Sequence, residues 1–311
     1  MIDLSIAIVS WNTCRLLDEC LASVQQDLAA QDKKMSLRAE IFVVDNGSTD
    51  GSVEMVRTRY PDVKLIANQN NPGFAAANNQ ALALASGRYS LLLNPDTVVL
   101  PDGLGALVRF MDDHPNAGAA GSRLLNPDRT LQPSCSPAPT LMRELWRMFH
   151  LDGLHPFGEY DMRKWSTTAP RPVDAVQGAA MLVRRSAHEQ VGLLDASYFM
   201  YSEEVDWCTR IKRAGWEIYW VPASQIVHYG GQSSKQAADA MFLQLYRGKI
   251  QYFHKHWGRF ATWAYKLVLV LATLARLVLT PLIWLEPQGR RQRHLVLARQ
   301  YGLLLRALPS M

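Results

Sequence analysis

The sequence predicts an α/β fold, in which helices cover both faces of a sheet, followed by a C-terminal helical extension. Three observations predict it: short apolar runs alternate with helical patterns in the first half of the chain, most of these runs end in turn-forming residues, and the pattern is helical from Lys235 onward. With 311 residues, 48% hydrophobic and 20% charged, the chain can bury a core of this kind.

The first half alternates strand and helix patterns. The expected strands are residues 4–9, 41–44, 63–67 and 89–93. The expected helices are residues 16–24, a helix from 49 or 50, residues 74–85, and a helix from Pro101 to about 113. Proline is favoured at the first position of a helix. Strands that are apolar throughout and separated by single helices are typical of a parallel sheet with both faces buried.

The middle of the chain, residues 114–173, is rich in proline and is predicted to be mostly loop. Order is expected to return in a strand at 175–184, a helix at 186–191, a helix at 203–214, a strand at 216–221 and a loop at 225–234.

Residues 261–285 form an apolar segment that could nearly cross a bilayer, but Lys266 and Arg276 interrupt it and Pro281 would break a helix. A charge at the bilayer centre costs about 2.5–3.5 kcal/mol on insertion scales. Trp263, Tyr265 and Trp284, followed by arginines, are instead typical of a helix lying in the membrane interface. The arginines are Arg290, Arg291, Arg293, Arg299 and Arg306. The alternatives are a helical pair that packs on the domain or on a second subunit as a homodimer, and a true span.

The composition limits the partners and the compartment. The net charge of +5 comes without dense Lys/Arg clustering, which argues against nucleic acid. The four cysteines lack metal-site spacing and are too few for a disulfide framework, which favours a reducing compartment. No basic leader precedes the first expected strand, so the catalytic part is expected in the cytoplasm.

Polar turns follow three of the first four expected strands, at Ser10-Trp11-Asn12, at residues 45–50 and at Asn94-Pro95-Asp96. Such residues are the default chemistry of turns, so each cluster alone is weak evidence. Together they place Asp45 and Asp96 at the carboxyl edge of one sheet, where ligands of open α/β sheets bind. Two neighbouring carboxylates can bind a divalent cation, and such a cation also binds phosphate oxygens. The phosphate-binding patterns GxGxxG and GxxxxGK[ST] are absent, which excludes most dehydrogenases and P-loop enzymes.

A second acidic cluster occupies the start of the helix expected at 203–214. The helix dipole stabilises anions there by about 0.3–1 kcal/mol each, which explains Asp206 adequately. Glu203 and Glu204 follow an aromatic run at 198–201, and a carboxylate beside apolar surface has a raised pKa and suits a general base. His228, in the expected 225–234 loop, is by itself more often a packed or surface residue than a ligand.

In their order, these motifs resemble glycosyltransferase family 2, and within it the rhamnosyltransferase-like branch. The resemblance covers about residues 3–255. The matching strings are residues 8–12 (IVSWN), 43–51 (VVDNGSTDG), 71–79 (NPGFAAANN), 93–97 (LNPDT), 178–185 (GAAMLVRR), 199–206 (FMYSEEVD) and 228–231 (HYGG).

The resemblance implies a GT-A fold, which has a Rossmann-like mixed sheet, and a catalytic domain at 1–257. Residues 1–113 would bind the nucleotide sugar, and residues 114–257 would carry the acceptor and catalytic half. Residues 258–311 lie beyond the resemblance, and their own apolar and basic pattern predicts an amphipathic helical region at the membrane. By position, Asp45 would contact the nucleotide base with Ser10 and Asn12 nearby, and the Asn78 region would help to close the donor pocket.

The resemblance also implies the chemistry, an inverting single displacement. Asn94-Pro95-Asp96 stands where the family carries Asp-x-Asp, so Asp96 and His228 would hold Mn²⁺ or Mg²⁺. Glu204 would be the catalytic base, with Glu203 as its neighbour. Two departures matter: Asn94 removes one charged ligand, and Glu at 204 replaces the family's shorter Asp.

The branch favours dTDP-L-rhamnose as the donor, ahead of UDP-hexoses and UDP-galactofuranose. It also favours a polyprenyl-diphosphate-linked glycan of cell-wall or O-antigen synthesis as the acceptor. The protein would then be cytoplasmic and peripheral on the inner face of the cell membrane. There are two competing hypotheses. A sugar nucleotidyltransferase would need a Gly-rich basic loop, which is missing here. An inactive nucleotide-sugar-binding protein would not need the set Asp96, Glu204 and His228, which is present.

Overall fold

The computed structural model describes residues 2–35, 37–280 and 288–311 and divides into two compact units. The first comprises Met1–Ala138, Asp161–Phe199 and Glu203–Gln236, and the second comprises Pro139–Tyr160, Met200–Ser202 and Ala237–Met311. The second unit thus begins before the expected boundary at 257/258 and takes in part of the proline-rich middle.

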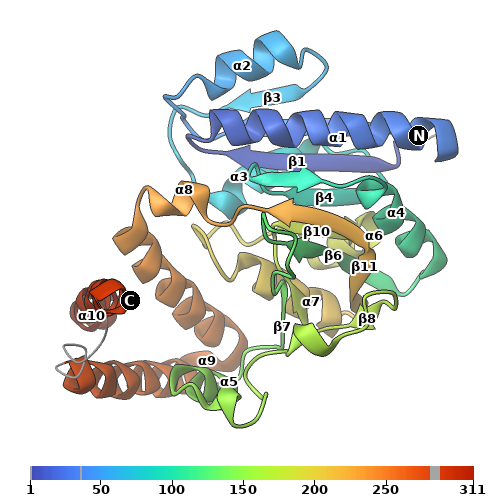
Figure 1. Cartoon of the computed structure of the whole chain (residues 1–311). Coiled ribbons are helices and arrows are strands. Elements are labelled where there is room, and N and C mark those ends of the chain that lie inside the picture. Colours follow the sequence, from blue (N-terminus) through green and yellow to red (C-terminus); the bar gives the residue numbers. More distant parts are fainter. Residues whose placement is uncertain (1, 36, 281–287) are drawn as a thin grey trace. The chain divides into compact units, whose positions relative to one another are not determined.

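A sheet of nine strands forms the centre of the first unit (Figure 1). Its order is β3-β2-β1-β4-β10-β6-β11-β5, with β8 paired to β11. The strands are β1 (Leu4–Ser10), β2 (Ala39–Asp45), β3 (Lys64–Ala67), β4 (Tyr89–Leu93), β5 (Thr97–Val99), β6 (Ala117–Leu125), β8 (Arg171–Pro172), β10 (Ala180–Arg184) and β11 (Glu217–His228). A separate pair joins β7 (Cys135–Ser136) and β9 (Ala175–Val176).

The strand directions are mixed. β3, β2, β1 and β4 are parallel, β10 runs antiparallel to both β4 and β6, and β5 runs antiparallel to β11. The parallel pairing expected of the four strands in the first half is therefore confirmed, and so is the mixed sheet implied by the family resemblance, because β10 and β5 are antiparallel to their neighbours. An apolar run of residues does not show in which direction its strand will lie, because the partner strands decide the direction of a strand within the sheet.

Helices cover both faces of this sheet. The helices of the first unit are α1 (Cys14–Met35), α2 (Ser52–Arg59), α3 (Phe74–Leu84), α4 (Gly103–Asp113), α6 (Arg185–Val191), α7 (Glu203–Arg213) and α8 (Gln232–Lys235), with a short 3₁₀ turn at Met162–Lys164. The main core cluster joins the sheet to residues of α1, α2 and α4, and α3, α6 and α7 contribute nothing to it. Because α3, α6 and α7 also contact the sheet, they cover its other face.

Several expected boundaries are corrected. Residues 114–173 are mostly loop, as predicted, but they also supply the central strand β6, which the prediction missed. The 175–184 strand is broken into β9 and β10, and α4 begins at Gly103 rather than at Pro101. The expected loop at 225–234 is also wrong at its start, because β11 continues through it to His228.

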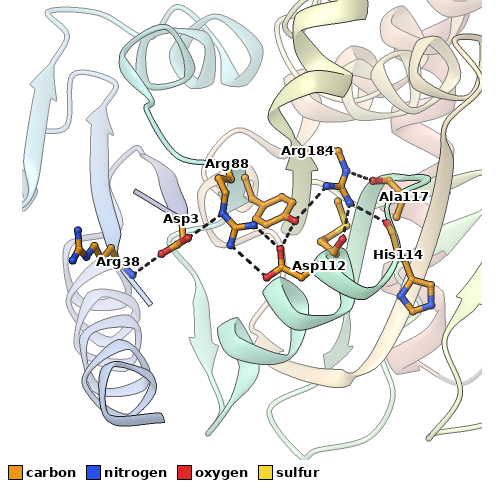
Figure 2. Close-up of polar contacts among 9 residues, drawn as sticks. Asp3, Arg38, Arg88, Asp112, His114, Ala117 and Arg184 are labelled. Carbon is orange, nitrogen blue, oxygen red and sulfur yellow. Dashed lines mark hydrogen bonds and ion pairs between the residues drawn. The ribbon is translucent and has the colours of Figure 1, made fainter. Parts of the chain in front are cut away.

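A polar network ties the amino end of β4 to its neighbours (Figure 2). Arg88 binds Asp3 at 3.0 Å and Asp112 at 2.6 Å, and the Tyr89 hydroxyl donates to Asp112 at 2.7 Å. Burial would raise the pKa of Asp112, but the hydrogen bonds from Arg88 and Tyr89 outweigh it and lower the pKa. Arg184 donates to the backbone carbonyls of Met111, His114 and Ala117. It thereby satisfies carbonyls that the end of α4 leaves open.

The second unit consists of α5 (Leu141–Met148), a 3₁₀ turn at Leu151–Gly153, α9 (Ala238–Leu279), α10 (Gln288–Ala307) and a 3₁₀ turn at Leu308–Ser310. Its core joins α5, α9 and α10 around Phe253, Tyr265 and Leu269. Beside this core, the buried Glu144 carboxylate binds Lys249 at 2.7 Å. Residues 258–311 are thus helical wherever the structure describes them, apart from Gly258, Met311 and the 3₁₀ residues.

The helix α9 is bent at Gly258, whose φ of 79° is not helical. Within the described residues, Ala238–Val278 is the one helix whose length and composition would allow a membrane span, a test that a helix on a protein surface can also pass. Arg276 donates to the Met148 carbonyl and lies over the Tyr301 ring. The predicted helix breaker Pro281 and the predicted anchor Trp284 lie outside the described residues, as do the side chains of Arg290 and Arg293.

Candidate active site

The carboxyl ends of β1, β2 and β4 meet at one edge of the sheet. Ser10 is paired in register with Asp45, and Leu93, the last residue of β4, is paired with Ile8. The turns that follow these strands are therefore neighbours, and the expectation of a shared edge is confirmed. Parallel pairing produces this arrangement because it aligns strand ends of the same polarity.

Asp45 is buried with one of its carboxylate oxygens unsatisfied. Its Oδ1 accepts the Ser48 N–H at 2.8 Å. Its Oδ2 is also buried and has no hydrogen-bond partner among the residues that the structure describes. A buried acceptor without a donor is costly, so this atom is suited to accept a hydrogen bond from a ligand. The neighbouring Ser10 hydroxyl lies 2.9 Å from Thr13 Oγ1 and is fully buried.

Asn12 links the first two turns. Its backbone N–H donates to Ser48 Oγ at 2.8 Å, and its side-chain Oδ1 accepts the Thr49 N–H at 2.8 Å. Its φ of 51° lies in the left-handed region, which asparagine tolerates better than most residues.

A pocket of about 420 Å³ opens beside Asn12, within the first unit. Asp50, Tyr229 and Gln232 contribute to its wall, and sequence reasoning gave none of the three a role. Burial would raise the pKa of Asp50, but hydrogen bonds from the Ser52 hydroxyl and the Cys14 N–H outweigh it and lower the pKa. Asp50 is therefore a carboxylate held in place at the pocket wall.

Asp96 and His228 come together because β5 pairs with the end of β11. Thr97 is in register with His228, and the Tyr229 N–H donates to the Asp96 carbonyl at 2.9 Å. His228 Nε2 lies 3.3 Å from Asp96 Oδ1 and 3.3 Å from Asn94 Nδ2. The two side chains are 5% and 6% exposed, so this is a buried pair at the edge where Asp45 also lies.

Gln132 fixes the tautomer of His228. The Gln132 amide nitrogen donates to Asn126 Oδ1 at 3.0 Å and to the His228 carbonyl at 3.1 Å. Its Oε1 therefore faces His228 Nδ1, at 2.7 Å, and Nδ1 must carry the proton. In the neutral imidazole the lone pair is then on Nε2, the nitrogen that lies 3.3 Å from Asp96 Oδ1. Sequence reasoning missed Gln132, because only the folded chain brings it to His228.

The residues present fit a divalent cation. A carboxylate oxygen and an imidazole lone pair 3.3 Å apart repel each other unless a cation or a proton lies between them. Two ligands about 2.1 Å from a small cation such as Mg²⁺ lie about 3 Å apart when they subtend a right angle, close to the observed 3.3 Å. No cluster of three or more His, Cys, Asp and Glu that could hold a metal occurs among the described residues. Such a site would need substrate phosphates to complete it, as is common for Mg²⁺.

Glu203 and Glu204 begin α7 in different environments. Glu203 is buried, and its Oε2 lacks a hydrogen-bond partner within the described part of the chain. Burial, and then the charge of Glu204, raise the pKa of Glu203 well above its usual value. Glu204 is half-buried, which makes it the more accessible carboxylate. Asp206 instead binds Arg210 at 2.8 Å and is a structural residue.

The residues before β10 connect Glu204 to the segment that carries Asn94 and Asp96. A Cβ on Gly178 would lie 3.7 Å from Glu204 Cβ and 3.5 Å from the Phe74 ring. Next to Gly178, the Ala179 carbonyl accepts the Asn94 N–H at 3.0 Å. Glu204 and Asn94 therefore flank the same short segment.

Asn78 lies apart from the pocket. It is buried within α3, its Nδ2 donates to the Phe74 carbonyl at 2.9 Å, and it does not line the pocket beside Asn12. Its Oδ1 is buried without a hydrogen-bond partner in the described residues. The Phe74 end of α3 is in turn held by the Phe199 carbonyl, which accepts the Phe74 N–H at 2.7 Å.

Comparisons with known proteins identify the family. The sequence profile of glycosyl transferase family 2 matches residues 5–192. The chain is 32% identical over 217 residues to the N-acetylglucosaminyl-diphospho-decaprenol L-rhamnosyltransferase of Mycobacterium tuberculosis, covering 62% of this chain and 67% of that protein. It is 26% identical over 177 residues to the rhamnosyltransferase WbbL of Escherichia coli, covering 55% of this chain and 66% of that protein.

A solved structure shares the fold. The mannosyltransferase PcManGT of Pyrobaculum calidifontis, in complex with GDP-Man and Mn²⁺, superposes with a TM-score of 0.57 at 18% identity. The match covers 97% of this chain and 84% of that one.

Proposed function

The chain belongs to glycosyl transferase family 2 and has the GT-A fold, and from this premise we propose that it transfers L-rhamnose from dTDP-L-rhamnose to a polyprenyl-diphosphate-linked glycan. The names of two relatives, both rhamnosyltransferases and one acting on a diphospho-decaprenol, support the sugar and the acceptor. The observation that carries the proposal is the buried contact of Asp96 Oδ1 with His228 Nε2 at 3.3 Å.

The proposed donor site begins at Asp45. A thymine or uracil ring offers one N–H at N3, and the unsatisfied Asp45 Oδ2 is an acceptor suited to it. This chemistry supports a dTDP- or UDP-sugar. In the proposal, Ser10 and Asn12 shape the turns around the base, Asn94 adjoins the diphosphate, and Asn78 helps to close the donor site from α3.

Asp96 and His228 would hold Mn²⁺ or Mg²⁺, which when bound offsets the negative charge of the departing diphosphate. Gln132 Oε1 accepts from His228 Nδ1, which in the neutral ring leaves Nε2 as the ligand atom, and Asp96 is held through its carbonyl by the Tyr229 N–H. The structural relative that was solved with Mn²⁺ supports a metal in general.

Glu204 is the proposed general base. It would take the proton of the acceptor hydroxyl as that oxygen attacks the anomeric carbon from the face opposite the diphosphate. This single displacement inverts the anomeric configuration and needs no covalent enzyme intermediate. Burial and then the charge of Glu204 raise the pKa of Glu203, which favours placing the negative charge of the pair on Glu204.

We also propose that the enzyme is cytoplasmic and peripheral, with residues 258–311 at the inner face of the membrane. The alternative is that these helices pack against a second copy of the chain in a homodimer. In the same proposal, residues 1–113 hold the donor and residues 114–257 hold the acceptor and the base.

The test is transfer of radiolabelled sugar from dTDP-L-rhamnose, a UDP-hexose and UDP-galactofuranose to a polyprenyl-diphosphate glycan, with Mn²⁺ or with EDTA. We expect product with dTDP-L-rhamnose and Mn²⁺ and none with EDTA or with Asp96→Ala. Thermal shifts with each donor provide a second readout, because a ligand of the folded state raises its apparent stability. Donor binding without any transfer or hydrolysis would indicate an inactive binding protein and would refute the proposal.

A further inference from the structure

A basic pocket lies within the second unit, around the bend of α9. It measures about 600 Å³ and is lined by Arg247 and His254 before the bend and by Arg259, Trp263 and Lys266 after it. No Asp or Glu is among the described residues that line it.

No Asp or Glu side chain among the described residues compensates the charge of this pocket. Residues 240–311 hold eleven of the 33 Lys and Arg residues of the chain, but only Glu286 of its 28 Asp and Glu residues. Among the described residues, the guanidinium groups of Arg247 and Arg259 make no hydrogen bond or ion pair, whereas Lys266 donates to a main-chain oxygen of Met311, which also lines the pocket. The pocket therefore offers two guanidinium groups to an anion.

The acidic side chains of the second unit that the structure describes are engaged elsewhere. Glu144 binds Lys249, Glu159 binds Arg147, and Asp239 binds Arg299. The carboxyl group of Asp152 accepts backbone N–H groups of residues 157–159. None of these four lines the pocket.

An exposed apolar stripe begins at the same place. Side chains three and four residues apart on α9 face outward and are 43–81% exposed, namely Phe260, Trp263, Leu267, Leu271, Leu274 and Val278. This spacing places them on one side of the helix, while Tyr265, Leu269 and Ala272 face the core of the unit and are at most 2% exposed. Trp263 belongs to both the stripe and the pocket wall.

We propose that this pocket binds the phosphate group of an anionic membrane phospholipid, with the stripe in contact with the acyl chains. Guanidinium groups match phosphate oxygens in geometry and charge. Tryptophan favours the level of the headgroups, and a helix with one apolar face and basic flanks lies in the interface. The inference rests on the proposed membrane location and adds to it a defined lipid site.

The same phosphate chemistry occurs in a polyprenyl diphosphate and in free pyrophosphate, so the experiment separates the sources. Binding of the full chain is measured by sedimentation with neutral phosphatidylcholine vesicles, with vesicles containing phosphatidylglycerol, and with neutral vesicles containing a polyprenyl diphosphate. Inorganic pyrophosphate is added as a competitor in a further arm.

The variant Arg247→Gln/Arg259→Gln removes the two guanidinium groups. Its matched control, Lys255→Gln/Arg306→Gln, removes the same charge from α9 and α10 outside the pocket lining. We expect the pocket variant to bind phosphatidylglycerol vesicles about 30-fold more weakly, since each basic residue at a membrane surface contributes about a fivefold effect. The control should change by less than about threefold. Unchanged donor thermal shifts in both variants would verify that the first unit is intact.

Equal losses in the two variants would indicate diffuse charge attraction and overturn the site, while leaving the membrane location standing. Binding that requires the polyprenyl diphosphate, or that millimolar pyrophosphate abolishes on its own, would also overturn the assignment to a phospholipid. If the wild-type chain binds none of the vesicles, both the site and the membrane location fail.

Discussion

Replacing Gln132 by Leu tests whether the chain sets the metal-binding state of His228 in advance. Gln132 accepts the His228 Nδ1–H at 2.7 Å and anchors itself by donating to the His228 carbonyl at 3.1 Å. In Gln132→Leu the ring proton loses its acceptor. It can then move to Nε2, where Asp96 Oδ1 lies 3.3 Å away. Both proposed ligand atoms would be occupied by that one proton.

Gln132→Leu is expected to bind the metal about 10–100-fold more weakly, which is the usual effect of removing the hydrogen-bond partner of a metal-binding histidine. This corresponds to about 1.4–2.7 kcal/mol. The upper part of this range is expected, because the His228 side chain is only 5% exposed and water cannot readily replace the lost acceptor.

The assay is an Mn²⁺ titration in the presence of dTDP, followed by electron paramagnetic resonance, and it does not depend on turnover. Nitrogen-15 chemical shifts of the labelled histidine report the tautomer directly. Gln132→Glu is the matched control, because it keeps an acceptor at Nδ1 and should retain affinity within a few-fold. If Gln132→Leu binds Mn²⁺ as tightly as the wild type, or keeps the proton on Nδ1, the reasoning is refuted.

Three further predictions concern the carboxylates. In thermal-shift measurements Glu204→Gln should bind the donor normally. Its kcat should fall about 10²–10⁴-fold, the usual effect of losing a general base. Unimpaired product formation would show that Glu204 does not have this role. Burial and then the Glu204 charge raise the pKa of Glu203 in the folded protein. The protonated Glu203 therefore contributes fully to the free energy of unfolding below about pH 4.3, the pKa of an unfolded glutamate, and this contribution is lost as the pH rises through the pKa of the folded protein. Glu203→Gln mimics the protonated acid, so its melting temperature should match the wild type at pH 4 and exceed it at pH 8, and a lower value at pH 8 would contradict this. Lys249→Met leaves the buried Glu144 carboxylate without its 2.7 Å partner and should cost about 3–5 kcal/mol in denaturant unfolding, whereas the exposed Lys255→Met should cost under about 0.5 kcal/mol.

Local sequence patterns were sufficient to predict the parallel strands in the first half of the chain. The strands β1, β2 and β4 are apolar runs that end in Asx- and Gly-containing turns, so their existence and the side on which Asp45 and Asp96 emerge followed from the chain itself. The residue types at this edge then indicated anion and metal chemistry before any partner strand was known.

The strand β6 is the element that the prediction for the middle of the chain missed. It is rich in Ala and Gly, which have low strand propensity, and it lies between proline-containing loops. The fold nevertheless needs small residues there: a Cβ on Gly118 would lie 2.6 Å from Trp216 Cβ, and one on Gly121 would lie 2.7 Å from Val176 Cβ. Neighbours distant in sequence therefore dictate its composition.

The sequence by itself determined the family, the α/β architecture and the carboxylate and histidine side chains available for chemistry, because these follow from residue type and local period. Only the tertiary structure decided that β10 and β5 reverse direction, that His228 ends a strand opposite Thr97, and that Gln132, 96 residues away, sets its tautomer. The physical reason is that hydrogen bonds between distant segments depend on which strands pair, and strand pairing is a property of the whole core rather than of any local stretch of chain.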